Sequence, residues 1–331
     1  MSYLYYVLGA AIIIYTLIDI IWTTLWVDGG AGWITDRLTT FIWRRILKSE
    51  KELFLDISGP LILSVTLFTW FLLLWIGATV FFAGDLNAIV NSSTNQSITW
   101  YQLPYYSGFV VFTLGIGDFT PQTTLFQLAT ALFSGVGMVM LTFGASYILS
   151  IVSAVVEKRT FARNITGIGE SSFEFLESIW NGENFHQLDD VLADLNSQIT
   201  QYTQQIKAFP LLQYYHSEKI EKTTTVAMAV LYESVLILKY GIIEEGLVNE
   251  TLVHATIKSI NNYIDTSDEG FGNLFEDYDG TPPILNLSSL SHLDIPLANQ
   301  KEFSNKVEIY KENRHRLQKI IMIDHHKWPN Q

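Results

Sequence analysis

The sequence predicts an all-α membrane protein whose long apolar helices are followed by a second, acidic helical domain. Of the 331 residues, 49% are apolar, yet the net charge is -13, a combination that does not fit one ordinary soluble domain. The apolar residues gather in runs at 3–27, 58–83 and 124–156. Each run is long enough to cross a hydrocarbon core of about 30 Å, which takes roughly 20 helical residues.

The first run is expected to form a retained transmembrane helix within residues 1–30. It has no basic region before it and is too long for the core of a signal peptide. Asp19 lies inside this run, where a carboxylate is expensive and indicates either a sensing role or a polar packing contact. Aromatic residues mark both ends of the run, as in the belts at membrane interfaces: Tyr3, Tyr5 and Tyr6 at one end, and Trp22, Trp26 and Trp33 at the other.

Basic residues set the expected orientation, because short cytoplasmic segments are enriched in lysine and arginine. None precedes Arg37, several follow within residues 37–51, and the next ones appear only at Lys158, after the third run. This pattern predicts a multi-pass protein of the cell membrane with its N-terminus outside. Residues 28–57 and the whole C-terminal part, from about residue 157, are expected in the cytoplasm.

Residues 31–57, between the first two runs, are expected to form an interfacial amphipathic segment. Apolar residues recur there at helical spacing, with basic residues along one flank. A helix of this kind lies on the inner leaflet, where its basic residues meet anionic headgroups. Arg45 interrupts the apolar stripe, so a solvated linker is the alternative. The apolar positions are Ile34, Leu38, Phe41, Ile42 and Ile46, and the basic ones are Arg37, Arg44 and Lys48.

The segment 84–123 holds a compact apolar run and then the string TLGIGDFTP, residues 113–121. Non-helical backbone is tolerated at membrane depth only inside protein or beside a watery cavity, so a short helix followed by a glycine turn indicates a pore. Gly115 and Gly117 can adopt left-handed backbone angles, which turns successive carbonyls toward one axis. Four such strands would make carbonyl rings that replace the hydration shell of a cation, with the Thr113 hydroxyl at the inner end.

With these residues the chain resembles the potassium channel family, whose filter reads Thr, aliphatic, Gly, aromatic, Gly, Asp. The resemblance covers about residues 58–156 and implies an outer helix at 58–83, a pore helix at 101–112, a filter at 113–118 and an inner helix at 124–156. It implies K⁺ bound by oxygens of Thr113, Leu114, Gly115, Ile116 and Gly117. It also implies Asp118 at the outer mouth, Tyr105 and Tyr106 as braces of the filter, and Gly137 as a gate hinge.

One pore loop per chain requires four chains for a closed ring, so a homotetramer in the lipid bilayer is expected. The function that follows is passive K⁺ conduction regulated by a cytoplasmic domain. Ile116 replaces the family's aromatic residue and Phe112 its hydroxyl residue, which leaves open a weakly selective monovalent cation channel. A non-conducting membrane scaffold or sensor is the other alternative. For Gly137, close helix packing is the alternative to a hinge.

Residues 157–331 are expected to form an acidic cytoplasmic helical domain. Apolar residues at alternating spacings of four and three run from Leu188 to Phe209 and form a heptad seam. The seam could join subunits or close a helix hairpin within one domain. Further helices are expected over 218–245, 249–264 and 298–323, with a loop at 266–296 because of its prolines and glycines.

The cytoplasmic domain shows no catalytic arrangement and no nucleotide-binding motif, so an enzyme is not expected, and nucleic acid is not among the expected partners. A regulatory ligand or protein is the partner expected for it. Asp265, Ser267, Glu269 and Glu276 have the spacing of a calcium loop, which gives a tentative Ca²⁺ site with a solvated acidic loop as the alternative. The histidines at 315, 325 and 326 are expected on the surface. The absence of cysteine excludes disulfides and thiolate metal sites.

Overall fold

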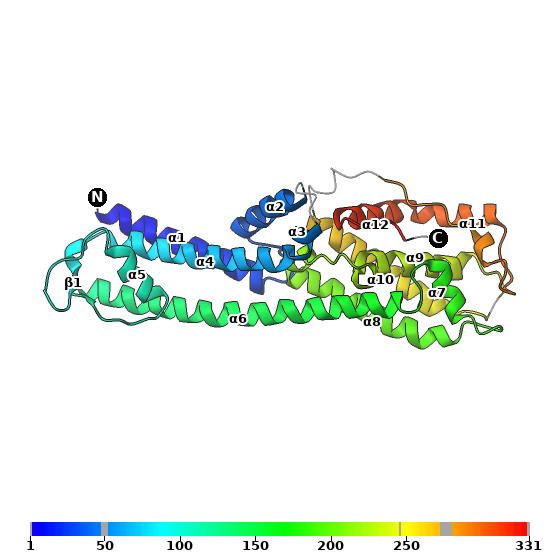
Figure 1. Ribbon diagram of the computed structural model, residues 1–331, viewed down its shortest axis with the longest axis horizontal. Coiled ribbons are helices and arrows are strands. Elements are labelled where there is room, and N and C mark those ends of the chain that lie inside the picture. Colours follow the sequence, from blue (N-terminus) through cyan, green and yellow to red (C-terminus); the bar gives the residue numbers. More distant parts are fainter. Residues whose placement is uncertain (1, 48–51, 245, 272–279, 330–331) are drawn as a thin grey trace. The chain divides into compact units, whose positions relative to one another are not determined.

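The structure is a computed structural model that describes residues 2–47, 52–244, 246–271 and 280–329 (Figure 1). It is built mainly of α-helices, so the predicted all-α class is confirmed. The chain divides into two compact units. We call Met1–Ser49 with Gly59–Val152 the membrane unit, and Glu50–Ser58 with Ser153–Gln331 the helical unit.

Among the described residues, three helices are long and apolar enough to cross a membrane: α1 (Ser2–Leu25), α4 (Ser58–Phe82) and α6 (Thr124–Thr166). They match the three apolar runs. Helix α6 continues past the predicted end at residue 156, because no glycine or proline follows until Gly167. Hydropathy locates the membrane-spanning part of a helix, not the point where the helix ends. The boundary between the two units therefore falls inside α6.

Helices α1 and α4 approach each other closely through glycine. A Cβ on Gly9 would collide with the backbone of Gly77 and Phe81 on α4. Small residues at such positions let membrane helices bring their backbones together.

Helix α2 (Trp33–Leu47) forms inside the predicted amphipathic segment, and the short α3 (Glu52–Asp56) follows. Asp19 on α1 binds the start of α2: its Oδ1 accepts the backbone N–H of Ile34 at 2.8 Å, and its Oδ2 accepts the Thr35 hydroxyl at 2.6 Å. The indole of Trp70 on α4 also donates to Oδ2, at 3.0 Å. The first N–H groups of a helix have no partner within it, and a carboxylate there is favourable. The packing alternative therefore accounts for this buried carboxylate. Lys48 lies outside the described residues.

Between α4 and α6 lie a 3₁₀ turn η1 (Leu86–Ala88), strand β1 (Ile89–Asn91), helix α5 (Leu103–Val111) and strand β2 (Phe119–Pro121). The strands pair antiparallel, with Val90 opposite Thr120. Helix α5 is the short helix expected at 101–112.

The helical unit is organised around α9 (Thr224–Tyr240), in which every residue from Thr224 to Leu238 is buried. A helix that is buried on all sides needs neighbours on all sides. They are α7 (Ser172–Ile179), α10 (Glu250–Phe271), α11 (Gln300–Val307) and α12 (Lys311–Ile323). The 3₁₀ turns η2 (Pro210–Tyr214), η3 (Ile220–Lys222), η5 (Leu287–Leu290) and η6 (Glu308–Tyr310) complete the unit.

Helix α8 (Gln187–Ala208) carries the heptad seam, and the seam is used inside the chain. Its apolar residues from Leu188 to Ile206 are buried, and α8 packs along α10. The ring of Tyr202 stacks on that of Tyr263, with centroids 5.7 Å apart. The seam is therefore used within one domain, although its partner is α10 and not the next helix of a hairpin.

Candidate pore segment

Residues 113–118, which we call the pore segment, leave the C-terminal end of α5 in a fixed direction. The backbone N–H of Thr113 donates to the carbonyl of Val110 at 3.2 Å, and that of Leu114 to Phe109 at 2.9 Å. These bonds satisfy carbonyls that the end of a helix would otherwise leave without partners.

Along the pore segment, residues with positive φ alternate with residues whose φ is not positive. The angle φ is positive at Thr113 (57°), Gly115 (58°) and Gly117 (83°), but not at Leu114 or Ile116 between them. Glycine adopts this region without steric cost, whereas a threonine there is strained. The two glycines thus occupy the left-handed conformation that the sequence predicted for them.

The pore segment is exposed along its whole length, although the residues on either side of it are not. Val111 and Phe119 are buried, whereas the side chains of Leu114 and Ile116 are 64% and 50% exposed. A Cβ on Gly115 or Gly117 would meet no atom within 4 Å. Open space therefore surrounds this part of the backbone within a single chain.

Three hydrogen bonds hold the C-terminal end of the pore segment. The hydroxyl of Tyr105 donates to Oδ2 of Asp118 at 2.8 Å, so the structure brings together one predicted brace and the last filter residue. Ser92, which follows β1, donates its hydroxyl to the carbonyl of Gly117 at 2.6 Å and its N–H to that of Asp118 at 2.8 Å. Sequence reasoning missed Ser92, because it lies 25 residues from Gly117 in an otherwise featureless polar stretch.

The other predicted brace, Tyr106, does not contact the pore segment through its hydroxyl. That hydroxyl lies 2.6 Å from Oγ1 of Thr130 on α6, so Tyr106 joins α5 to α6. On the opposite side, the indole of Trp75 on α4 donates to the carbonyl of Pro104 at 2.9 Å. Phe112 packs against Phe71 and Trp75 of α4. Helix α5 is therefore held by both long helices.

Gly137 lies where α6 crosses α5. A Cβ there would collide with the carbonyl oxygen of Val111, and α6 runs through this position without a break. Close packing therefore accounts for the glycine, and the hinge stays a prediction.

The described residues of the predicted calcium loop do not form a loop. Asp265, Ser267 and Glu269 lie on helix α10, not in a loop, because no proline or turn motif precedes residue 270 and the helix continues. Asp265 instead pairs with Arg316 of α12, its Oδ1 lying 2.7 Å from Nη1. Glu276 lies outside the described residues.

A buried polar cluster in the helical unit includes His326, one of the three histidines expected on the surface, whereas His325 is exposed as expected. His216, only 4% exposed, places Nδ1 2.9 Å from Oδ1 of Asp324, and Thr225 donates to the other carboxylate oxygen at 3.0 Å. His326, partly buried, stacks on His216 with centroids 5.1 Å apart. Spacing along the chain could not reveal this cluster, because His216 lies 108 residues before Asp324.

The geometry of this cluster is that of a hydrogen-bonded carboxylate and does not suit a metal centre. The ligand atoms of His216, Asp324 and His326 lie within 4.8 Å of one another. Yet the two rings are stacked at 24°, so their in-plane lone pairs do not converge, and both carboxylate oxygens already accept hydrogen bonds. Burial alone would raise the pKa of Asp324, but the bond to His216 and the charge of Lys158 outweigh it and hold that pKa below its usual value.

Residues next to the cluster contact α6 near its C-terminal end. Lys158 on α6 is buried and donates from Nζ to the carbonyl of Tyr215 at 2.9 Å. Thr224, the first residue of α9, donates its hydroxyl to the carbonyl of Lys158 at 3.0 Å. Residues on both sides of His216 thus hold one turn of α6.

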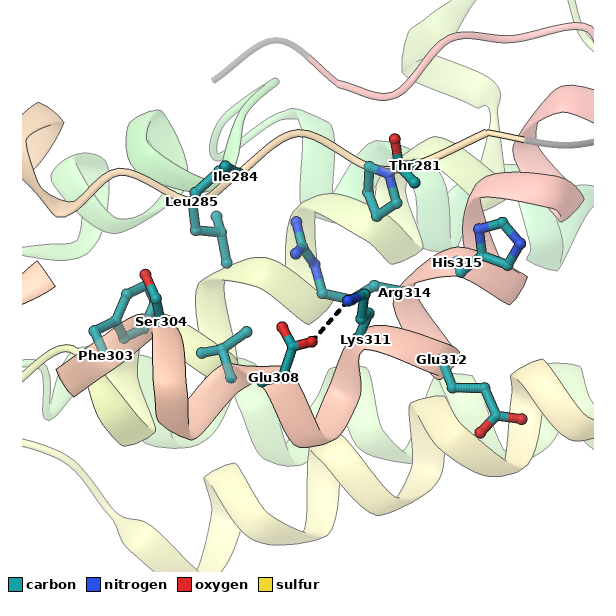
Figure 2. Close-up of a pocket in the computed structure, with 12 residues that line it drawn as sticks. Thr281, Ile284, Leu285, Phe303, Ser304, Glu308, Lys311, Glu312, Arg314 and His315 are labelled. Atoms are coloured by element: carbon teal, nitrogen blue, oxygen red, sulfur yellow. Dashed lines mark hydrogen bonds and ion pairs between the residues drawn. The ribbon is translucent and has the colours of Figure 1, made fainter. Parts of the chain in front are cut away.

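The helical unit contains a cavity of about 720 Å³ at the junction of α11, α12 and the segment 281–285. This volume suits a small organic molecule. Figure 2 shows Glu308 and Lys311 paired beside it, with Leu285 and Phe303 among the apolar lining residues. Arg314 also lines the cavity, and its Nη2 lies 2.6 Å from Oε1 of Glu233 on α9.

No protein family model matches the sequence, and no solved structure matches the chain. The chain is 34% identical over 329 residues to a Bacillus subtilis (strain 168) protein named "Uncharacterized membrane protein YdjJ". The alignment covers 99% of this chain and 96% of that protein. The chain therefore belongs to the same family as the membrane protein YdjJ.

Proposed function

We propose that this protein is a subunit of a homotetrameric potassium channel of the cell membrane. Four pore segments would surround one axis, and K⁺ would pass through them down its gradient. The observation that carries the proposal is the exposed pore segment after α5, whose φ angles alternate in sign at Thr113, Gly115 and Gly117. Alternation of this kind suits backbone carbonyls that turn toward a common axis.

The ligands for K⁺ would be oxygen atoms of the backbone. Carbonyls from residues 113–117 of four chains, with the Thr113 hydroxyl, would replace the hydration shell of the ion. Asp118, fixed by Tyr105, would stand at the outer mouth. One pore segment per chain requires four chains for a closed ring, and this ring would cover the exposed Leu114 and Ile116.

Regulation would act through α6. This helix carries residues of both units, and in the helical unit Lys158 is held by hydrogen bonds with Tyr215 and Thr224. A ligand or protein that changes the helical unit would therefore change the strain on α6. In this arrangement the N-terminus lies outside and the helical unit lies in the cytoplasm.

A weakly selective monovalent cation channel is the second candidate. Ile116 favours it, because an aliphatic side chain cannot make the hydrogen bond by which a phenol would hold the pore segment from behind. The backbone carbonyls would still bind cations, but a less rigid ring discriminates less between K⁺ and Na⁺.

The test is cation flux from liposomes that contain the purified chain, with K⁺ and Na⁺ gradients measured separately. Gly115→Ala forces a side chain into a left-handed conformation, and K⁺ flux should disappear. Gly182→Ala is the matched control, because Gly182 also has a positive φ (94°) and open space around it but lies in the helical unit. Its flux should remain. Equal K⁺ and Na⁺ flux would favour the second candidate, and no flux under any condition would favour a non-conducting scaffold.

A further inference from the structure

Helix α2 presents four residues at a spacing of four along one exposed face: Trp33, Arg37, Phe41 and Arg45. Residues at this spacing are neighbours on a helix surface. Trp33 and Phe41 are 56% and 58% exposed, and both arginines are exposed. We call these four residues the arginine–aromatic ladder.

Each arginine of the ladder lies over the aromatic ring that precedes it. The guanidinium carbon of Arg37 is 3.7 Å from the ring centroid of Trp33, and that of Arg45 is 5.3 Å from Phe41. Stacking on a ring restricts a guanidinium without neutralising its charge, and its N–H donors stay available in the plane. The ladder therefore offers two oriented cations, each beside an apolar ring.

The ladder begins at the level of a membrane-spanning helix. Asp19, which binds the first turn of α2, lies six residues before the end of α1 at Leu25, or about 9 Å along the helix axis. Trp33 itself contacts Tyr15 of α1, with ring centroids 5.9 Å apart. Tyr15 lies ten residues before Leu25, about 15 Å along the helix axis, so the first rung of the ladder lies beside the apolar length of α1.

The opposite face of α2 packs within the chain, since Thr35, Thr39, Trp43 and Ile46 are buried. The ladder faces away from them. Exposed aromatic rings are unfavourable in water but suit the interface between headgroups and acyl chains. Exposed arginines at that depth attract the anionic phosphates of the same interface.

We propose that the arginine–aromatic ladder binds anionic phospholipid headgroups in the leaflet next to α2. Arg37 and Arg45 would each bind a lipid phosphate, and Trp33 and Phe41 would lie among the upper parts of the acyl chains. A guanidinium can hold a phosphate through two parallel N–H bonds. The inference concerns the membrane unit alone and does not depend on ion conduction.

The experiment measures the preference of the full chain for phosphatidylglycerol over phosphatidylcholine. The purified protein is reconstituted in mixed bilayers, and spin-labelled lipids of each kind report how much lipid is immobilised on the protein. Arg37→Gln and Arg45→Gln should each lower the preference for phosphatidylglycerol roughly fivefold, as expected for one basic residue near an anionic surface. Arg37→Lys should recover part of it, because charge returns without the planar fork.

Arg44→Gln is the control for stacking, because Arg44 is an exposed arginine on the same face of α2, whereas the guanidinium over the Phe41 ring is that of Arg45. Its effect should be much smaller. An equal loss at Arg37, Arg44 and Arg45 would overturn the ladder in favour of diffuse charge, and no preference for phosphatidylglycerol in the folded wild-type chain would overturn lipid binding. A change in oligomer mass with an unchanged lipid preference would assign the face to a protein partner and reject the proposal.

Discussion

The carboxylate of Asp19 lies 2.8 Å from the backbone nitrogen of Ile34 and thereby ties the first membrane-capable helix to the start of α2. The same carboxylate accepts the indole N–H of Trp70 from α4. Three helices of the membrane unit meet at this side chain, so its removal should weaken the packing of all three.

Asp19→Asn should destabilise the membrane unit. The amide keeps an oxygen for Ile34, but its NH₂ group can accept a hydrogen bond from neither Thr35 nor Trp70. Leaving buried donors without acceptors costs roughly 1–3 kcal/mol. Thermal unfolding in detergent, followed by circular dichroism, measures the loss, and Trp70→Phe, which removes one donor, should cost less. Unchanged stability with altered conduction would restore a sensing role for Asp19.

Alanine substitutions at two glycines of α6 test whether Gly137 serves close helix packing or acts as a hinge. Gly137→Ala should destabilise the protein or displace α5, because the new methyl collides with the Val111 carbonyl. Gly135→Ala should be neutral or stabilising by up to about 1 kcal/mol, because a Cβ there meets no atom within 4 Å and alanine favours helix. Unfolding midpoints of the two variants give the comparison. Equal stability with lost flux only in the Gly137 variant would support a hinge.

Acid should weaken the helical unit through Asp324. Its pKa is held below the unfolded value, so its contribution to stability is present above the unfolded pKa of about 3.9 and is lost as the pH falls through the lower folded value. Asp324→Asn leaves Lys158 and His216 facing a neutral group, and the loss at pH 7 should reach roughly 3–5 kcal/mol. At acid pH, the free energy of unfolding of the variant should also fall less steeply with pH than that of the wild type.

Hydrogen exchange at residues 155–166 gives a local reading of the same change. If Asp324 helps to hold α6, exchange there should rise in the Asn variant, whereas exchange in α1 should not change. A uniform rise in exchange over the whole chain would show general unfolding, and would contradict a specific role of Asp324 in holding α6.

Glu233 should produce the opposite pH dependence. Burial raises the pKa of Glu233 from 4.5 to about 7, although Arg314 and Trp328 oppose the shift. The folded state therefore keeps a proton that the unfolded state has lost, and stability falls as the pH rises from about 4.5 to 7. The whole change is on the order of 3 kcal/mol.

Glu233→Gln should remove this fall while keeping an acceptor for Arg314. Unfolding midpoints of the variant and the wild type are measured at pH 5.5 and 8.5. The midpoint of the variant, relative to that of the wild type, should be higher at pH 8.5 than at pH 5.5. A constant difference between the two proteins would show that Glu233 does not titrate in this range.

The sequence predicted the elements whose signal is local. Apolar runs located α1, α4 and α6, and the heptad spacing located α8. Contacts between distant residues gave no such signal: Ser92 reaches Gly117, and His216 reaches Asp324, only because the chain folds back. The calcium spacing failed because carboxylates on α10 also serve as partners for Arg316, and spacing alone does not distinguish these uses.

The fully buried α9 has a consequence for biosynthesis. Its 17 residues leave the ribosome before α12 can cover them, and a segment so apolar is a substrate for the membrane insertion machinery. It is shorter than the roughly 20 residues that a span requires, and an ionised side chain at the centre of a helix opposes insertion by about 2.5–3.5 kcal/mol. Glu233, whose partner Arg314 is made 81 residues later, would thus help to keep α9 in water until the rest of the helical unit arrives.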